Sequence, residues 1–262
     1  TQRSAINQYT CQYKPITDSL DANRFDDKYA DCLSYYENPS MIGTSYLFGV
    51  IALIISYIVA LPAGVLMARK KGKFADKVGI VVINFLIAVP SLALIFFVRQ
   101  IGSNFNFPDR FPILGFENIR SYIIPIIILV LLQIPSLMTW MRRYMIDQSN
   151  ADYAKFAKAK GLSQKEIFTK HILKNAIIPI VNGIPSSIIL CISGALITET
   201  AFAIPGMGKM LPDAIKVANN NMVICLVFIF TTLSIISILV GDLLMTVVDP
   251  RIQLAAKGGK KK

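Results

Sequence analysis

The sequence of 262 residues is long enough for one large domain or two small ones. Hydrophobic residues make up 54% of it and charged residues only 16%, a balance that excludes an ordinary water-soluble monomer. The formal net charge of +11 fits a partner that is either nucleic acid or anionic lipid, so the positions of the basic residues have to decide between the two.

The apolar residues gather in five runs that contain few or no charges. Each run has the length of about 20 residues that a helix needs to cross a bilayer. Lipid offers the backbone no hydrogen-bond partner, so the runs predict an all-α membrane protein, a polytopic helical bundle. The predicted spans are Ser45–Ala68, Val78–Val98, Tyr122–Met141, Ala176–Thr198 and Met222–Val248.

The segment before the first span, residues 1–43, is polar and rich in Asp. It contains Cys11 and Cys32, which we expect to pair with each other or with other cysteines if the segment lies outside the cell, where disulfides persist. The chain begins with Thr1, and no hydrophobic stretch precedes Ser45. We therefore expect a further span before this segment, and six spans in the full protein.

The basic residues concentrate in alternate loops. Arg69–Lys77, Arg142–Lys174 and the tail from Arg251 hold 5, 8 and 5 Lys and Arg residues, whereas the intervening segments together hold nine basic and nine acidic residues. The positive-inside rule makes the basic loops cytoplasmic, which predicts an external N-terminus for this chain and a cytoplasmic basic tail over residues 251–262. The excess charge then faces lipid headgroups, and nucleic acid is not an expected partner.

The sequence contains few residues of the kinds that catalysis requires. His171 is its only histidine, so it cannot build a His-rich metal centre or a His-based triad. It also lacks the Gly-x-x-x-x-Gly-Lys-Ser/Thr pattern that binds nucleotide phosphates, so another subunit has to hydrolyse ATP if ATP is used. The two acidic residues of the apolar spans, Glu199 and Asp242, lie near span ends. We predict a non-catalytic chain without a metal or cofactor of its own.

The most informative stretch is the predicted cytoplasmic loop Asn150–Ala176, which its residue spacing divides into two short helices. In the first helix Tyr153, Phe156 and Ala157 recur at helical spacing. Gly161 is placed to end that helix, because glycine readily adopts the positive φ of a helix terminus. The pattern predicts a helix, a glycine turn and a second helix.

The second helix is predicted to open with a capping box. In Ser163-Gln-Lys-Glu166, the serine hydroxyl covers the amide of Glu166 and the glutamate carboxylate reaches back. Ile167, Phe168 and His171 then form an apolar and aromatic stripe. Two short helices that cannot fold alone either dock into a groove on a partner protein or lie on the lipid surface.

Two motifs in this loop carry a resemblance to a known family. They are Ala154-Lys-Phe-Ala157-Lys-Ala-Lys-Gly161-Leu162-Ser163 and His171-Ile-Leu-Lys-Asn175-Ala-Ile-Ile-Pro179. Together they resemble the cytoplasmic "EAA" loop of ABC importer permeases of the oligopeptide, dipeptide and nickel type. The Glu position of the family pattern holds Lys155, and Lys174 replaces its Pro after the second helix. The resemblance implies that this loop is a coupling helix seated in a cleft of an ATPase subunit.

A third motif follows the fourth span. Gly194-Ala-Leu-Ile-Thr-Glu199-Thr-Ala-Phe202-Ala-Ile-Pro205-Gly206-Met-Gly208 is similar to the family's segment that ends the fifth of six helices and leads into an external turn. A purely structural role also explains Pro205-Gly206, because this pair forces a turn. The resemblance covers residues 44–254 and is specific for residues 150–208. The candidate coupling residues are Tyr153, Ala154, Phe156, Ala157, Gly161, Leu162, Ser163, Glu166, His171 and Asn175, and the candidate residues of an external gate or turn are Glu199, Phe202, Pro205, Gly206 and Gly208.

The resemblance implies the type I ABC importer permease fold, with residues 44–250 as its transmembrane domain and residues 1–43 as the end of an enlarged extracellular domain of the sort associated with Gram-positive bacteria. It further implies a pathway subunit of an oligopeptide importer in a bacterial plasma membrane. The implied partners are a second homologous permease, two ATPase subunits that bind ATP and Mg, an extracellular substrate-binding lipoprotein and the peptide. The alternatives are a nickel or other small-solute permease of the same family and, from another class, a secondary transporter.

Overall fold

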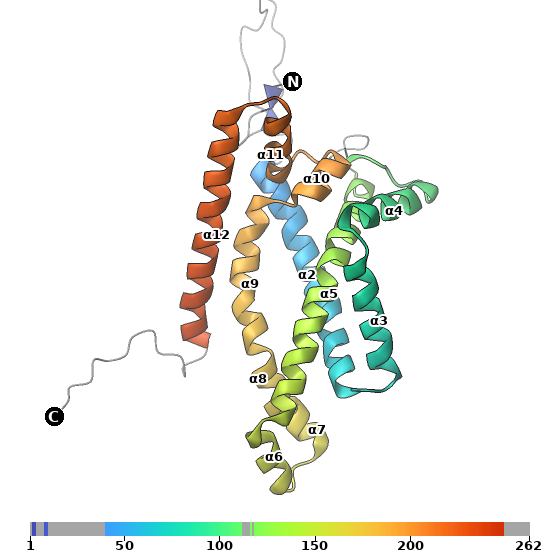
Figure 1. The fold of residues 1–262 in the computed structure, drawn as a ribbon, viewed down its shortest axis with the longest axis vertical. Helices are drawn as coiled ribbons and strands as arrows, with labels where there is room; N and C mark the ends of the chain where they lie inside the picture. Colours follow the sequence, from blue (N-terminus) through green and yellow to red (C-terminus); the bar gives the residue numbers. More distant parts are fainter. Residues whose placement is uncertain (1, 4–7, 10–39, 112–115, 117, 249–262) are drawn as a thin grey trace, which may run out of the picture.

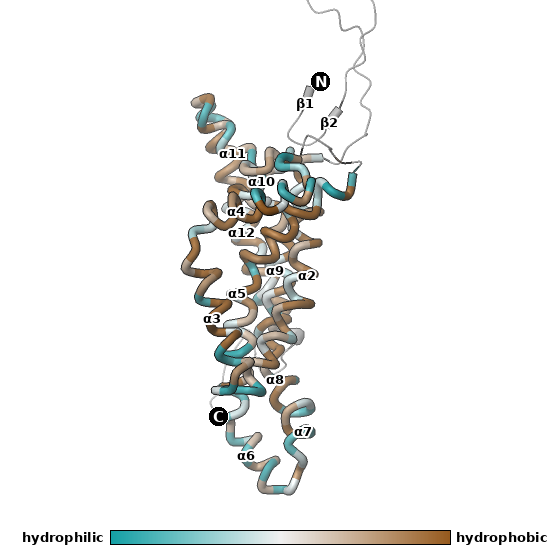
Figure 2. The backbone as a smooth tube through the Cα atoms, turned by 90° about the vertical axis from the view of Figure 1, so that its right-hand side faces the viewer, coloured by the Kyte–Doolittle hydropathy of each residue, from teal (hydrophilic) through white to brown (hydrophobic). Residues whose placement is uncertain are grey.

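The computed structural model describes residues 2–3, 8–9, 40–111, 116 and 118–248 of the protein. Long helices run along the longest axis of the molecule, with short helices gathered at both ends (Figure 1). Hydrophobic residues cover the shafts of the helices, and hydrophilic residues gather at the ends (Figure 2). This distribution suits a bundle whose middle part lies in lipid.

In the described ranges, the regular secondary structure is helical except for two short strands. The strands, β1 (Gln2–Arg3) and β2 (Gln8–Tyr9), pair antiparallel with Gln2 opposite Tyr9. The helices are α2 (Met41–Arg69), α3 (Phe74–Ala88), α4 (Ser91–Asn104), α5 (Arg120–Asn150), α6 (Asp152–Ala159), α7 (Gln164–Glu166), the π-helix η2 (Ile167–Leu173), α8 (Lys174–Ala176), α9 (Ile178–Leu190), the 3-10 helix η3 (Cys191–Ser193), α10 (Leu196–Phe202), α11 (Met207–Lys216) and α12 (Asn220–Val248).

The hydropathy pattern locates three of the five predicted spans correctly. Among the described residues, four helical runs are long and apolar enough to cross a membrane, and one bent pair brings the number to five if it counts as one span. Helices α2, α5 and α12 confirm the first, third and fifth predicted spans. The side-chain hydroxyl of Ser40 caps α2 by accepting a hydrogen bond from the amide of Gly43 at 3.0 Å.

The second predicted span, Val78–Val98, is not one continuous helix. The chain bends by 103° between α3 and α4, at Val89 and Pro90. A proline disfavours the helical conformation of the residue before it, and Val89 accordingly has an extended backbone with φ −75° and ψ 125°. The prediction of a single straight helix is therefore wrong, and α4 leaves the direction of α3 at one end of the bundle (Figure 1).

The fourth predicted span, Ala176–Thr198, begins and ends at other residues in the structure than the sequence predicts. It belongs to a helical run over Gln164–Ser193, so the second helix predicted for the preceding loop is the beginning of this run and not a separate helix. The run ends at Gly194, whose φ of 73° no other residue type adopts easily. Thr198 lies beyond this break, in the short helix α10.

Close contact between α2 and α5 forms the centre of the bundle. Ala52 and Ala60 are completely buried, and a Cβ atom at Gly64 would lie only 2.8 Å from the Cβ atom of Met141. Small residues of this kind let two helices approach closely inside a membrane. Near one end of the pair, the ring of Phe48 stacks on Tyr122 with centroids 5.1 Å apart.

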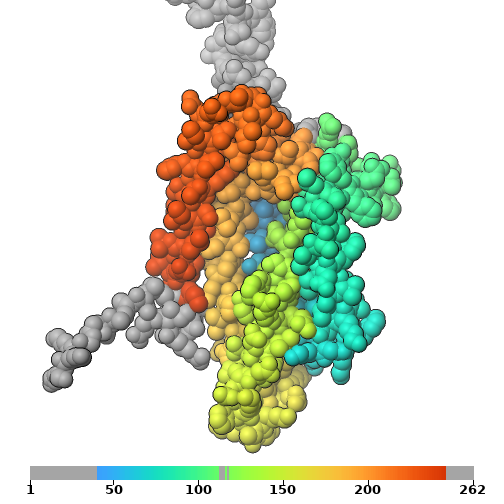
Figure 3. Space-filling view, in the orientation of Figure 1, coloured from blue at the N-terminus to red at the C-terminus, as the bar shows by residue number. Residues whose placement is uncertain are grey.

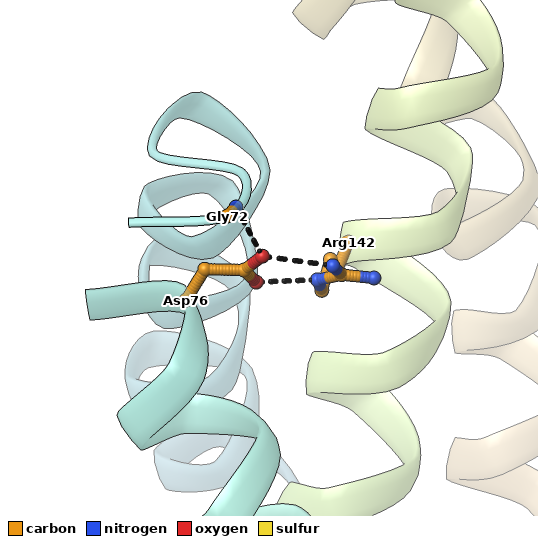
Figure 4. Close-up of polar contacts among 3 residues, drawn as sticks. All are labelled: Gly72, Asp76 and Arg142. Carbon is orange, nitrogen blue, oxygen red and sulfur yellow. Dashed lines mark hydrogen bonds and ion pairs between the residues drawn. The ribbon is translucent and has the colours of Figure 1, made fainter. Parts of the chain in front are cut away.

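A buried ion pair joins α3 to α5 at the opposite end of the bundle (Figure 4). Arg142 donates from Nε to Oδ1 of Asp76 at 2.6 Å and from Nη2 to Oδ2 at 2.9 Å. The amide of Gly72, in the loop before α3, donates to Oδ2 at 2.8 Å. The Asp76 side chain is only 2% exposed, so these three hydrogen bonds replace the water that its charge would otherwise require.

We expect Arg142→Met to lower the free energy of unfolding by about 3 kcal/mol, because the substitution leaves the buried carboxylate of Asp76 without its partner. The combined variant Asp76→Asn/Arg142→Met should recover much of this loss. Thermal unfolding of the purified protein measures both effects. The control is Lys155→Met, which removes an exposed ion pair with Asp152 and should leave the Tm unchanged. Equal Tm values for Arg142→Met and Lys155→Met would contradict the assignment.

Candidate functional site

The predicted coupling loop packs one of its faces against the helices that lead into it. Ala154 and Ala157 on α6 are 5% and 6% exposed and join a core cluster that includes Met145 on α5 and Ile172 on η2. Both alanines lie on the face of α6 that packs against α5 and η2. The two alanines of the motif therefore position α6 on the bundle.

The outward face of α6 carries a different set of residues. The side chain of Phe156 is 69% exposed, and that of Lys155 is 68% exposed. The sequence predicted Phe156 and Ala157 on one interacting stripe, and the structure separates them, because consecutive residues on a helix point about 100° apart. Phe156 is therefore the exposed aromatic residue of this helix.

Local predictions for the turn between the two loop helices are confirmed. Gly161 has a φ of 82°, and a Cβ atom there would meet no atom within 4 Å, so the backbone conformation alone favours glycine. The hydroxyl of Ser163 accepts a hydrogen bond from the amide of Glu166 at 3.2 Å. The Glu166 carboxylate accepts a hydrogen bond from Lys170 at 2.8 Å. The serine side of the predicted capping box is therefore present.

The other predicted loop residues contribute contacts that hold the loop together. The hydroxyl of Tyr153 donates a hydrogen bond to the side-chain oxygen of Gln148 at 2.6 Å, which ties α6 to the end of α5. Leu162 packs against the same core cluster as the alanines. His171 and Asn175 are half-buried on the helical run toward α9. Arg69 at the end of α2 lies 5.7 Å from the ring centre of Phe168 and adds a cation–π contact to the loop.

At the opposite end of the bundle, the predicted external turn is organised by one carboxylate. Glu199 is 2% exposed, and its Oε1 atom accepts hydrogen bonds from the hydroxyl of Ser45 at 2.8 Å and the amide of Ala195 at 2.9 Å. Its Oε2 atom accepts one from the amide of Lys209 at 3.0 Å. The Ser45 hydroxyl also accepts a hydrogen bond from the amide of Met207 at 2.7 Å. The carboxylate therefore joins α10, the start of α11 and the first turns of α2.

The glycines of this motif leave room for that carboxylate. A Cβ atom on Gly194 or Gly206 would overlap the carboxylate of Glu199, and one on Gly208 would lie 3.0 Å from its Oε2 atom. Phe202 is buried in the core cluster that contains Phe48. Gly206 and Gly208 thus make room for the Glu199 carboxylate, whereas Phe202 packs the turn against α2. Pro205 lies in the connection between α10 and α11.

The structure also contains a cavity that the sequence did not indicate. Its volume is about 450 Å³, and it lies between α2, α5 and the run from α9 to η3, beside the carboxylate of Glu199. Its polar lining includes Tyr57, Gln133, Ser136 and Ser187. The signal in the sequence was Gln133, a polar but uncharged residue within an apolar run.

Several predicted features lie outside the described residues, namely Cys11, Cys32 and the tail over residues 251–262. Of the other cysteines, Cys191 donates a hydrogen bond from its thiol to the backbone oxygen of Ser187 at 3.2 Å, and Cys225 is exposed. Within the described ranges, no group of three or more His, Cys, Asp and Glu side chains is arranged to hold a metal ion.

Comparison with known families now adds to this geometry. Residues 60–254 match the family described as the inner membrane component of binding-protein-dependent transport systems. The chain belongs to this family. The matched range contains both the coupling loop and the external turn, and it covers all of the described helical structure from the latter part of α2 onward.

Two curated relatives illustrate the likeness within the family. The chain is 50% identical over 261 residues to the oligopeptide transport system permease protein AmiC of Streptococcus pneumoniae, an alignment that covers 98% of this chain and 52% of AmiC. It is 30% identical over 211 residues to the dipeptide transport system permease protein DppB of Lactococcus lactis, covering 80% of this chain and 69% of the relative. The chain thus spans about half the length of AmiC.

Solved structures confirm the fold. An amino acid ABC transporter crystallised with histidines matches with a TM-score of 0.60 and 14% identity, covering 79% of this chain and 90% of that chain. The methionine ABC transporter MetNI in an inward-facing conformation matches with a TM-score of 0.61 and 15% identity, covering 79% and 93%. The bundle therefore has the fold of ABC importer permeases, as the sequence predicted.

Replacing Gly161 by Ala should increase the rate of amide hydrogen exchange in α6 about fivefold, since a positive φ costs a Cβ-bearing residue about 1 kcal/mol. Gly161→Asn should have a smaller effect, because asparagine tolerates positive φ better. Gly183→Ala is the matched control, as Gly183 also faces open space but has no positive φ. An exchange rate in α6 that is the same in Gly161→Ala and Gly183→Ala would show that the turn conformation does not matter.

Glu199→Gln should lower the free energy of unfolding by about 1–3 kcal/mol, because the side-chain amide group turns a donor toward backbone N–H groups that need an acceptor. Hydrogen exchange should become faster in α10 and the first turn of α11. The control is Asp213→Asn, which neutralises a half-exposed carboxylate of α11 that forms only loose pairs with Lys209 and Lys216, at 3.7 and 3.6 Å. If both variants unfold at the wild-type temperature, Glu199 does not organise the turn.

Proposed function

We propose that this chain is the transmembrane pathway subunit of an ATP-driven oligopeptide importer. The observation that carries the proposal is the 50% identity to AmiC, a relative named as an oligopeptide transport permease, over 98% of this chain. The alignment includes the loop and the turn whose geometry is described above. The chain itself supplies the path through the membrane, and ATP hydrolysis takes place in partner subunits.

The proposed orientation places the coupling loop in the cytoplasm and the Glu199 turn outside. The loop between α2 and α3 lies at the same end of the bundle as α6 and α7, whereas α4, α10 and α11 lie at the other end (Figure 1). The basic loops Arg69–Lys77 and Arg142–Lys174 therefore share one end, which supports a cytoplasmic location for it under the positive-inside rule. The N-terminus of the chain is then external and the C-terminus cytoplasmic, in a bacterial plasma membrane.

The proposed partners are a second homologous permease, two ATPase subunits that bind ATP and Mg, and an extracellular lipoprotein that delivers the peptide. The exposed aromatic ring of Phe156 between lysines suits a groove on an ATPase subunit, because a hydrophobic anchor with a basic surround gives both affinity and orientation.

Coupling between the two ends follows from the helical run Gln164–Ser193. The buried alanines of α6 fix the loop to this run and to α5, so the loop and the cytoplasmic ends of these helices move together. The run leads from the loop to Gly194, directly beside Glu199. We infer that closure of the ATPase subunits displaces the loop, and that this run transmits the displacement toward the external turn to alternate access to the two sides.

The coupling role is tested with Phe156→Glu, which adds a charge to a surface that has to be buried against an ATPase subunit. Phe156 is exposed, so the variant should keep the wild-type Tm. Peptide uptake by the reconstituted complex and stimulation of its ATPase activity should fall at least about tenfold, the equivalent of a burial penalty above 1.4 kcal/mol. Retention of the ATPase subunits during purification provides a second readout.

The matched control for this experiment is Phe74→Glu. Phe74 begins α3, is 83% exposed and lies outside the loop, so the same substitution there should preserve uptake and retention of the ATPase subunits. Ala157→Glu is unsuitable, because Ala157 is buried within the loop and a charge there would disturb its packing. Normal uptake by Phe156→Glu would contradict the coupling role of this face.

A further inference from the structure

The cavity between α2, α5 and α9 has the size and position of a ligand site. Its volume of about 450 Å³ falls in the range of small-ligand pockets. In Figure 3, α2 is visible at the back of a hollow between α9 and α5. The turn held by Glu199 borders one end of this cavity, so a solute that passes the turn reaches it directly.

Two polar side chains in the cavity wall have no partner within the described part of the chain. Gln133 and Ser136 lie one turn apart on α5, near the middle of that helix, and both line the cavity. Neither side chain forms a hydrogen bond with another described residue, whereas the Ser187 hydroxyl across the cavity donates to the backbone oxygen of Gly183 at 2.9 Å. Gln133 thus presents a free amide group, with two donors and an acceptor.

Both side chains are accessible from the cavity, because Gln133 is half-buried and Ser136 is exposed. A molecule in the cavity can therefore form hydrogen bonds with the polar groups that the protein leaves free there. The rest of the wall around Gln133 is largely apolar, with Leu53, Leu132 and Leu137 among the lining residues. This position is therefore suited to a polar ligand that also carries apolar groups.

The charges of the residues that line the cavity limit the kinds of ligand that it can bind. Lys, Arg and His are absent from the residues that line it, and its one carboxylate, Glu199, already accepts hydrogen bonds at both oxygen atoms. The wall therefore offers no unpaired charge to bind an ionised side chain. A peptide group matches the amide of Gln133, because each carries both a donor and an acceptor.

We propose that Gln133, assisted by Ser136 one turn away, binds the main-chain peptide groups of the substrate as it passes through this cavity. The inference rests on the proposed function and adds a substrate contact to it. The leucine side chains contact the substrate side chains without selecting among them, since apolar contacts are not directional. The subsite would therefore recognise the backbone of neutral peptides, largely independently of their sequence.

The test uses the complete transporter reconstituted in proteoliposomes with its binding protein and ATP. The two substrates are tetra-alanine and an analogue that is N-methylated at one internal peptide nitrogen, which lacks one main-chain donor. The variants are Gln133→Leu and Gln133→Met, and the control is Gln100→Leu, which removes an exposed glutamine of α4 that does not line the cavity.

For wild-type protein and for Gln100→Leu, N-methylation should lower the uptake rate at saturating peptide about tenfold, the effect of one lost hydrogen bond. Gln133→Leu and Gln133→Met should transport tetra-alanine about tenfold more slowly than wild-type protein. In these variants the uptake rates of the two peptides should differ by about twofold at most. Any effect of N-methylation on the binding protein is common to all variants and cancels in this comparison.

A photoreactive benzophenone amino acid provides a direct measurement of position. Placed at Leu132, which lines the cavity, it should crosslink to radiolabelled tetra-alanine during transport. Placed at Ile127, an exposed residue of α5 outside the cavity, it should not.

The outcomes separate the subsite from the proposed function. Uptake of both peptides by wild-type protein, together with an unchanged N-methylation effect in both Gln133 variants, would overturn the subsite and leave the importer intact. Crosslinking at Ile127 but not at Leu132 would do the same. Absence of uptake of either peptide by the assembled wild-type complex would overturn the proposed function itself, and the inference with it.

Discussion

Every backbone amide inside a membrane bundle needs a hydrogen-bond partner within the protein, and the break between η3 and α10 interrupts the helix that would provide one. The Glu199 carboxylate replaces the missing helical acceptors by binding amides from Ala195 and Lys209. The hydroxyl of Ser45 extends the same cluster to α2. Because one side chain binds the amide that follows the break and an amide in the first turn of α11, the chain can leave the helical path here and form a cavity beside it while these backbone groups stay hydrogen-bonded.

The remaining helices are arranged around α2 and α5. The aromatic cluster at Phe48 fixes this pair at the end with the Glu199 turn, and the ion pair between Asp76 and Arg142 adds α3 at the other end. Helix α12 packs beside α9, where Ser186 donates a hydrogen bond to the backbone oxygen of Ser237 at 2.6 Å. The bundle therefore combines a closely packed pair with outer helices whose outward faces remain apolar, as lipid or a second permease requires.

The sequence predicts this structure well where one physical rule dominates. Run length and hydropathy locate the spans, and the need for positive φ locates the turn at Gly161. The sequence predicts side-chain burial less well where the packing between helices determines it. Helical spacing groups Phe156 with Ala157, but the position of α5 determines that Ala157 is buried and Phe156 is exposed. The motif points to Glu199, yet its partner Ser45 lies 154 residues away, and no local pattern could have paired them. Gln133 carries no charge, so the rule that ionisable residues inside spans mark functional sites does not identify it.

The π-helical segment Ile167–Leu173 lies between α6 and α9, where it connects the loop to the helical run. A π-turn contains one residue more than an α-turn, and one residue corresponds to about 100° of rotation around the helix axis. Deleting a single residue here would convert the segment into regular α-helix, which is the more favourable local conformation. Such a deletion would leave α6 in nearly the same orientation relative to α9, because the shorter segment still completes the same turns. A deletion in the regular helix of α9, by contrast, would rotate α6 by about 100° relative to the rest of α9, so the π-helical segment is the place where the run tolerates a change of length.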